Sequence, residues 1–271
     1  MKNRIILAPY SIWMLIFVIV PMCLVGLFAF TDSSGMFTIE NILSVGMYSN
    51  VVLRSIWLGG ISTIICLIIG YPMAYFISKM SQGNQSVALV LLMIPMWMSF
   101  LLRTYAWMTI LENNGLINNF LSLLGIGKVQ LINTRGAIVL GMVYNFLPYM
   151  ILPIYTVLEK INPSIIEAAQ DLGANRLKVF LKVILPLSLP GIISGITMVF
   201  VPAVSTFIIS KMLGGGANLL IGDLIEMQFL GSAYNPNLGS AISLILMILI
   251  MICTGIMNQF DSEDSNGGLI V

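Results

Sequence analysis

The chain has 271 residues, of which 58% are hydrophobic and only 8% are charged. Soluble domains average about 25% charged residues, so this chain has too few polar groups to cover a surface in water. It contains no histidine, which excludes a Ser-His-Asp triad, an HExxH zinc helix and imidazole proton relays. A mean hydropathy of +1.00 indicates a membrane protein, and a net charge of +1 gives no support for nucleic-acid binding.

Six apolar runs are long enough to cross a bilayer, so we predict an all-α polytopic membrane protein with six transmembrane helices. The first run is long for a signal peptide and no A-x-A cleavage site follows it, so we expect it to be retained. The runs are Pro9–Phe30, Ser55–Ile77, Val87–Leu111, Gly136–Leu158, Pro186–Ser210 and Gly239–Met257. We assign a membrane domain to residues 1–258 and a short polar tail to residues 259–271, and we expect this tail, which contains Gly267 and Gly268, to be frayed.

The basic residues favour an orientation with both termini in the cytoplasm, because lysine and arginine gather on that side of a membrane. With this orientation the inner flanks carry Lys2, Arg4, Lys79, Lys160, Arg176, Lys178 and Lys182. The outer segments carry Lys128, Arg135 and Lys211, with Arg54 at the edge of a span. The three cysteines are scattered through apolar runs, so neither a disulfide framework nor a metal site is expected.

Prolines and glycines mark places where the spans are expected to bend or pack closely. Two prolines share the fourth run, Pro148 and Pro153, which indicates either a bent helix lining a cavity or a helix whose neighbours tolerate the break. Pro190 and Pro202 raise the same alternatives in the fifth. Gly191 and Gly195 form a GxxxG-like pair, which predicts a closely packed partner helix from this chain or another.

The segment 159–185 between the fourth and fifth runs predicts a helix, a turn and a second helix in the cytoplasm. Asn162 or Ser164 can cap the first helix, and Ser164 with Glu167 fits a capping box. Gly173 supplies a left-handed end, and a second helix with basic residues for the lipid interface begins after Asn175. By itself this pattern is also compatible with a loop that only anchors two spans.

The same segment resembles the EAA motif of the permease subunits of binding-protein-dependent ABC importers. The matching residues are Glu167, Ala168, Ala169, Gly173, Leu185 and Pro186, with Val183 where the family usually has isoleucine. The resemblance implies a type I ABC importer permease fold, in a bacterial inner membrane, with a coupling helix that docks into an ATPase subunit. It assigns that coupling role to Glu167, Ala168, Ala169, Asp171, Leu172, Gly173 and Pro186.

Within that family the chain is most similar to the permeases that carry spermidine and putrescine. The resemblance is carried by Leu102–Trp107, Asp171–Ala174 and the glycine-rich run Gly214–Gly222. Related permeases for other organic cations or small solutes share parts of these segments, so they remain an alternative.

A polyamine presents several ammonium groups, for which carboxylates and aromatic faces are natural hosts. The candidates for the substrate path are Tyr105, Trp107, Glu112, Asp223 and Glu226. Tyrosine and tryptophan also line membrane interfaces, and loop carboxylates are usually solvated, so each candidate has a structural alternative. Arg103 lies inside a span but would repel a polyammonium ion; we do not assign it as a ligand.

The sequence predicts a transport subunit with no catalytic activity of its own. It has no Gly-x-x-x-x-Gly-Lys-[Ser/Thr] phosphate loop, so ATP and Mg²⁺ are expected on a partner. The resemblance implies a second similar permease, two cytoplasmic ATPase subunits and an extracytoplasmic binding protein. An ion-coupled transporter or a membrane-embedded enzyme would need polar or titratable groups at mid-membrane, and the interiors of the last three runs carry no charge.

Overall fold

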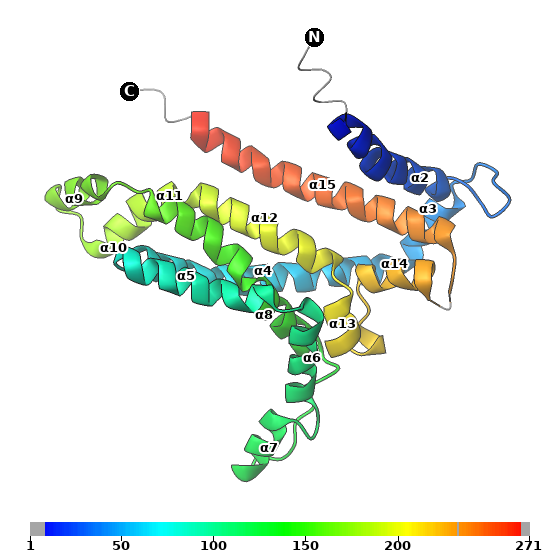
Figure 1. Cartoon of the computed structure of the whole chain (residues 1–271), viewed down its shortest axis with the longest axis horizontal. Coiled ribbons are helices and arrows are strands. Elements are labelled where there is room, and N and C mark those ends of the chain that lie inside the picture. Colours follow the sequence, from blue (N-terminus) through cyan, green and yellow to red (C-terminus); the bar gives the residue numbers. More distant parts are fainter. Residues whose placement is uncertain (1–8, 232, 267–271) are drawn as a thin grey trace.

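A computed structural model describes residues 9–231 and 233–266, and in this part of the chain the regular structure is helical apart from one isolated bridge between Thr31 and Phe37. The long helices are α4 (Ser49–Ser78), α8 (Arg135–Glu159), α12 (Leu189–Ser205) and α15 (Pro236–Asn266). A shorter helix, α2 (Val20–Ala29), packs on α15. Helices α4, α8 and α12 pack on one another, and α15 joins α12 to α2 (Figure 1). The expected all-α membrane fold is confirmed.

Shorter helices connect the long ones. They are α3 (Glu40–Ser44), α5 (Gln82–Trp97), α6 (Phe100–Leu111), α7 (Leu116–Leu123), α9 (Pro163–Asp171), α10 (Arg176–Val179), α11 (Leu185–Leu187), α13 (Ile208–Leu213) and α14 (Ile221–Leu230). Two π-helical turns, η1 (Leu15–Ile19) and η3 (Phe180–Ile184), and two 3₁₀ turns, η2 (Val45–Tyr48) and η4 (Gly216–Asn218), also occur, and residues 9–14 are helical. Helix α9 lies at one extremity of the molecule, far from α14 (Figure 1).

Four helical segments in the described residues are long and apolar enough to span a membrane, and two bent helix pairs bring the number to as many as six. The four are Pro9–Ala29, Glu40–Ser78, Arg135–Glu159 and Pro236–Met257. The bent pairs correspond to the third and fifth predicted runs. The six-span prediction therefore fits the structure only when each bent pair counts as one span.

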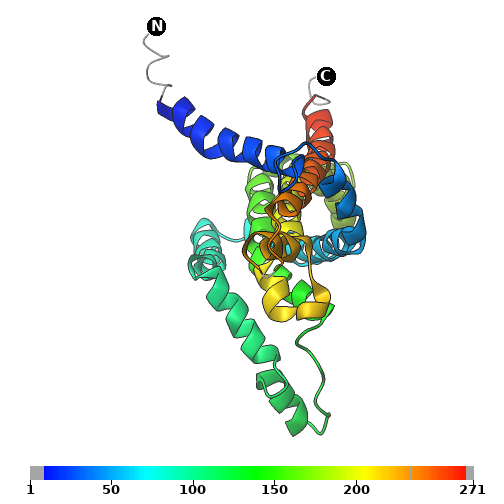
Figure 2. The same ribbon diagram turned by 90° about the vertical axis from the view of Figure 1, so that its right-hand side faces the viewer.

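The third run is not one continuous helix, which corrects the prediction for Val87–Leu111. Helix α5 ends at Trp97 and α6 begins at Phe100, and the two directions differ by 87°. Met98 and Ser99 between them have extended backbone, and Pro95 cannot donate the hydrogen bond that would continue the preceding turn. As a result α6 and α7 form an arm that leaves the helical body (Figure 2).

The fifth run also differs from its predicted bounds of Pro186–Ser210. The helical path begins earlier, at Arg176, bends by 61° near Ser188 and ends at Ser205. Thr206 is extended, so Ile208 starts a separate helix, α13. The reason is local: a residue with extended backbone cannot continue the i to i−4 hydrogen bonding of a helix.

Helix α15 runs through Asn266, so the first part of the expected polar tail continues the last span. Adding a residue to an existing helix costs far less than starting a new one, which favours this extension. The tail is therefore helical as far as Asn266, where we expected it to be frayed, and Gly267 and Gly268 lie outside the described residues. So do Lys2 and Arg4, on which the orientation argument partly depends.

The partner of the Gly191 and Gly195 pair is α8 of the same chain. A Cβ on Gly195 would lie 2.8 Å from the Met150 sulfur, and one on Gly191 would lie 2.9 Å from the Pro153 carbonyl oxygen. Lipid tails are as apolar as leucine, so close van der Waals packing of this kind is what holds membrane helices together. Helix α8 itself is continuous through both prolines, and Pro148 lines a cavity of about 520 Å³ between α4, α5 and α8.

Candidate functional site

Helix α9 is a capped helix outside the candidate spans. The Asn162 side-chain oxygen accepts hydrogen bonds from the Ser164 backbone N–H at 3.0 Å and from its hydroxyl at 2.8 Å, and Pro163 takes the first helical position. Asn162 has extended backbone, as an N-cap requires, whereas Ser164 is already helical. The capping box predicted for Ser164 and Glu167 is therefore wrong, and the alternative cap, Asn162, is correct.

Gly173 ends α9 in the left-handed conformation, with φ of +80°. The Ala174 N–H donates to the Ala169 carbonyl at 3.1 Å, and the Gly173 N–H donates to the Gln170 carbonyl at 2.8 Å. Such bonds satisfy carbonyls at a helix end, and glycine is the residue that adopts this φ without strain. Asn175 then caps α10 by accepting from the Lys178 N–H at 2.9 Å. Two caps around one glycine give a defined elbow.

One face of α9 packs inward and the other is exposed. Ile166 and Ala169 pack against the main apolar core, whereas Glu167, Ala168 and Asp171 are exposed. Leu172, the residue before the elbow, is 90% exposed. The outward face of α9 and its end therefore present one exposed leucine together with two carboxylates.

Beyond the elbow, Phe180 anchors the second helix to α4. Its ring lies edge-on to Tyr71 at 5.8 Å and to Tyr75 at 5.7 Å between centroids. The Tyr71 hydroxyl also shares a hydrogen bond of 2.9 Å with the Ser188 hydroxyl, at the bend two residues after the exposed Pro186. Nothing in the sequence around Phe180 indicates its aromatic partners, which come from α4.

The three candidates from the third run lie on or beside the α6 arm. Tyr105 is 56% exposed, and Trp107 is half-buried with its ring edge-on to Tyr144 of α8 at 5.4 Å. Glu112 directly follows α6 and is exposed, and its backbone carbonyl accepts from the Asn118 side chain at 3.1 Å. Trp107 therefore has a packing role that Tyr105 and Glu112 lack.

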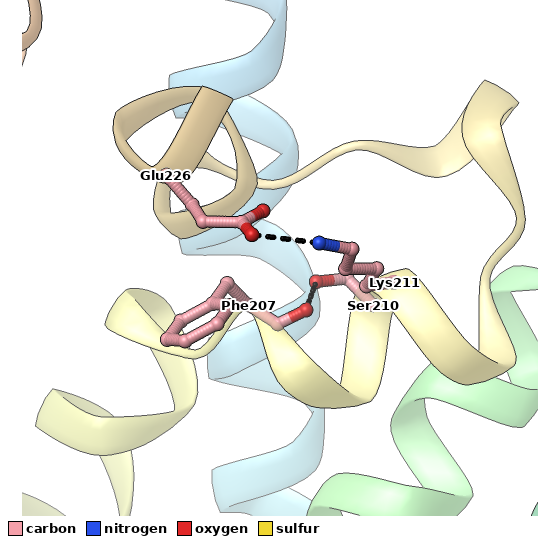
Figure 3. A network of polar contacts seen from close by, with 4 residues as sticks. All are labelled: Phe207, Ser210, Lys211 and Glu226. Carbon is pink, nitrogen blue, oxygen red and sulfur yellow. Dashed lines mark hydrogen bonds and ion pairs between the residues drawn. The ribbon is translucent and has the colours of Figure 1, made fainter. Parts of the chain in front are cut away.

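The two carboxylates of α14 are engaged within the chain. Glu226 forms an ion pair with Lys211 of α13, with 2.7 Å between the ammonium nitrogen and a carboxylate oxygen (Figure 3). Asp223 is only 2% exposed, and one of its oxygens accepts from the Leu220 N–H at 2.7 Å. In the described residues, no hydrogen bond or ion pair joins these carboxylates to Tyr105, Trp107 or Glu112.

The glycine-rich run 214–222 connects α13 to α14 and is tied to two other parts of the chain. The Arg54 guanidinium donates to the Ala217 carbonyl at 2.9 Å, and the Ser55 hydroxyl accepts from the Ile221 N–H at 2.8 Å. The Asn218 side chain donates to the Asn133 carbonyl at 3.2 Å and to the Gly214 carbonyl at 2.8 Å. These bonds position α14 against the start of α4 and the segment before α8.

Arg103, whose role the sequence left open, is buried in α6 with 8% of its surface exposed. Its Nε and Nη1 atoms have no hydrogen-bond partner among the described residues, and the guanidinium carbon lies 5.8 Å from the centre of the Phe100 ring. The guanidinium of Arg103 therefore makes a cation–π contact within its own helix.

A comparison with known proteins identifies the family. Residues 67–262 match the model of the binding-protein-dependent transport system inner membrane component. The spermidine/putrescine transport system permease protein PotB of Haemophilus influenzae is 39% identical over 92% of this chain and 90% of its own length. The inner membrane ABC transporter permease YdcU of Escherichia coli is 29% identical over 84% of this chain and 77% of its own.

Solved structures agree on the fold. A chain of a bacterial ABC transporter that imports alginate superposes with a TM-score of 0.83 at 18% identity, covering 97% of this chain and 95% of that one. A chain of the MetNI methionine ABC transporter gives a TM-score of 0.58 at 16% identity, over 78% and 93% of the two chains. The chain described here belongs to the family of binding-protein-dependent transport system inner membrane components.

Proposed function

We propose that this chain is the membrane permease subunit of an ATP-driven importer that takes up polyamines such as spermidine and putrescine. The observation that carries the importer assignment is α9, a doubly capped and exposed helix whose Glu167, Ala168 and Gly173 stand in the register of the EAA motif. The polyamine assignment rests on the identity of 36–39% to PotB proteins over most of the chain.

The partners follow from this assignment. An ATPase subunit docks on the exposed face of α9, that is, on Glu167, Ala168, Asp171 and Leu172, and holds the ATP and Mg²⁺ that this chain does not bind. Two such ATPases serve a pair of permeases, this chain and a second similar one. An extracytoplasmic binding protein delivers the substrate at the other end of the bundle. The transporter lies in the inner membrane, with both termini of this chain in the cytoplasm.

Movement of the ATPases reaches the spans through the elbow at Gly173. Because α9 is capped at both ends, it moves as a rigid unit with α10 and η3. Phe180 passes that movement to α4 through Tyr71 and Tyr75. Rigid-body motion of packed helices is a common way of opening and closing a site in the membrane.

The substrate path uses the opposite end of the bundle, where α6, α13 and α14 gather. An ammonium group gains about 0.5–2 kcal/mol from an aromatic face, and charge-assisted hydrogen bonds to carboxylates are stronger still. Tyr105 is the most accessible aromatic candidate, and Glu112, Asp223 and Glu226 supply carboxylates.

The test is uptake by the complex of both permeases and the ATPases in proteoliposomes, with the binding protein added outside. Binding protein loaded with spermidine or putrescine is expected to stimulate ATP hydrolysis and drive uptake, whereas an unrelated solute does neither. Stimulation by another organic cation without a response to polyamines would leave the importer assignment in place and contradict the assignment of polyamines as its substrates. Uptake without ATP would contradict the importer assignment.

A further inference from the structure

The Lys211–Glu226 ion pair joins α13 to α14 and is accessible. The lysine side chain is 59% exposed and the glutamate side chain 24% exposed. Exposed ion pairs of this kind stabilise a fold little, because solvent screens them and both side chains lose freedom. The ammonium of Lys211 can therefore leave Glu226 at little energetic cost.

A second carboxyl group lies one helical turn before Glu226. Positions 223 and 226 are three residues apart and share a helix face. One oxygen of Asp223 is buried and has no hydrogen-bond partner among the described residues. Burial is the main influence that raises the pKa of Asp223; Glu226 raises it further and Lys211 lowers it, which indicates that the three groups share one neighbourhood.

The neighbouring Ser210 side chain lies close enough to Asp223 to lower its pKa. The hydrogen bond of the Ser210 hydroxyl goes to the Phe207 carbonyl at 3.0 Å (Figure 3), so the buried oxygen of Asp223 keeps no hydrogen-bond partner among the described residues. The site thus combines an accessible carboxylate, Glu226, which is paired with Lys211, and a buried carboxyl oxygen of Asp223 that has no hydrogen-bond partner among the described residues.

On the basis of the proposed function, we infer that Lys211 is a tethered substitute for the substrate, whose place on Glu226 a polyamine takes during transport. A lysine side chain ends in a primary ammonium on a methylene chain, and so does a polyamine. One terminal ammonium replaces Lys211 on Glu226, and the next ammonium along the chain reaches the unpaired oxygen of Asp223, which has to be uncovered during transport because it is buried in this structure. The released lysine, already largely exposed, returns to water.

This arrangement selects for substrates with two or more ammonium groups. A monoamine only exchanges one ammonium for another on Glu226 and gains nothing. A diamine gains the second contact within the same molecule, where the effective concentration of its other ammonium is high. Lys211 then forms its ion pair with Glu226 again, which displaces the substrate from this carboxylate.

The alternative is that the ion pair only fastens α13 to α14, and the two interpretations differ in the sign of one result. If the pair is structural, Lys211→Met and Glu226→Gln both impair transport. If Lys211 competes with the substrate, Lys211→Met frees Glu226 and preserves or increases transport, whereas Glu226→Gln decreases it.

The experiment measures spermidine molecules imported per ATP hydrolysed by the complete transporter in proteoliposomes, with spermidine-loaded binding protein. We expect Glu226→Gln to lower this ratio by about tenfold, the effect of losing one strong charge-assisted contact. Lys211→Met is expected to keep or raise the ratio. The matched control is Lys128→Met, which removes another exposed lysine whose ammonium donates to Asn114 at 2.6 Å.

Each outcome decides the matter. Equal losses in Lys211→Met and Glu226→Gln would show that the pair is structural, and an unchanged ratio in Glu226→Gln would show that Glu226 does not contact substrate. If Lys128→Met raised the number of spermidine molecules imported per ATP as much as Lys211→Met did, general repulsion between lysine and the cationic substrate would explain the effect, and the inference would be wrong. The wild-type transporter separates this inference from the proposed function: if it imports no polyamine, the substrate assignment fails before the variants are compared.

Discussion

The two ends of this helical bundle are held together by different interactions. At the α9 end, capped helices, a glycine elbow and the Phe180 ring between two tyrosines make a continuous packed connection to α4. At the α13–α14 end, an accessible ion pair, a buried carboxyl group with a free oxygen and a projecting arm meet around a glycine-rich connection.

The difference fits the two roles proposed for this chain, coupling to an ATPase at the α9 end and passage of substrate at the α13–α14 end. An end that transmits movement must not deform, and aromatic packing with satisfied caps resists deformation. An end that passes a charged solute needs contacts that can be exchanged, and exposed or unpaired polar groups provide them. Three substitutions, from the largest expected effect to the smallest, test this contrast.

The largest effect is expected at the elbow. Gly173→Glu places a bulky acidic side chain at φ of +80°, which strains the turn and adds charge to the docking face. Uptake by the reconstituted transporter is expected to fall more than tenfold, with weakened ATPase binding in a pull-down assay. Gly173→Asn is the control, because asparagine tolerates left-handed backbone, and it should retain most uptake. Normal assembly and uptake in Gly173→Glu would contradict the coupling role of α9.

An intermediate effect is expected for Phe180→Ala. The substitution removes two edge-to-face ring contacts and part of the core packing, at a cost of about 2–3 kcal/mol in the free energy of unfolding. Both the thermal unfolding midpoint in detergent and the stimulation of ATP hydrolysis by loaded binding protein should decrease. Phe76→Ala, which removes a 68% exposed ring from α4, is the control. If the two variants behave alike, Phe180 does not link α9 to α4.

The smallest effect is expected for the buried carboxyl group of Asp223. Burial raises its pKa above the ordinary 3.8, so the folded chain keeps a proton that the unfolded chain releases. Stability therefore decreases as pH rises from about 3.8 through the raised pKa. Asp223→Asn keeps an acceptor for the Leu220 N–H and should remove this part of the pH dependence.

Thermal unfolding between about pH 2 and pH 8 measures the effect, and Asp32 provides a control of opposite sign at the acidic end of that range. The Ser34 hydroxyl, followed by backbone N–H groups, lowers the pKa of Asp32. Its contribution to stability is therefore lost as pH falls, and Asp32→Asn should alter only the acidic side of the profile. An unchanged profile in Asp223→Asn would mean that its carboxyl group is not buried in the assembled transporter.

Much of the coupling region was predictable because its signals are local. Asn162, Gly173 and Asn175 act on backbone groups within a few residues of themselves, so caps and elbow follow from the sequence around them. The choice between Asn162 and Ser164 as cap was not settled, because both residue types accept the same bond and only backbone geometry distinguishes them.

The α13–α14 end was less predictable because its contacts join distant segments. Asp223 and Glu226 were both named as candidates, but neither the pairing of Glu226 with Lys211 nor the burial of Asp223 has a signature in the sequence. The breaks after Trp97 and Ser205 also escaped prediction. Pro95 and Pro202 lie just before them, yet Pro148 and Pro153 occur within a continuous helix.

The sequence by itself determined that this protein lies in a membrane, that it is helical, and that a capped helix with a glycine elbow separates two spans. Those properties depend on composition and on interactions between near neighbours along the chain. Only the tertiary structure decided that Gly191 and Gly195 pack on α8, that Phe180 packs between the elbow and α4, and that Lys211 forms an ion pair with Glu226. Such contacts depend on how helices distant in sequence pack together, and no local pattern encodes that.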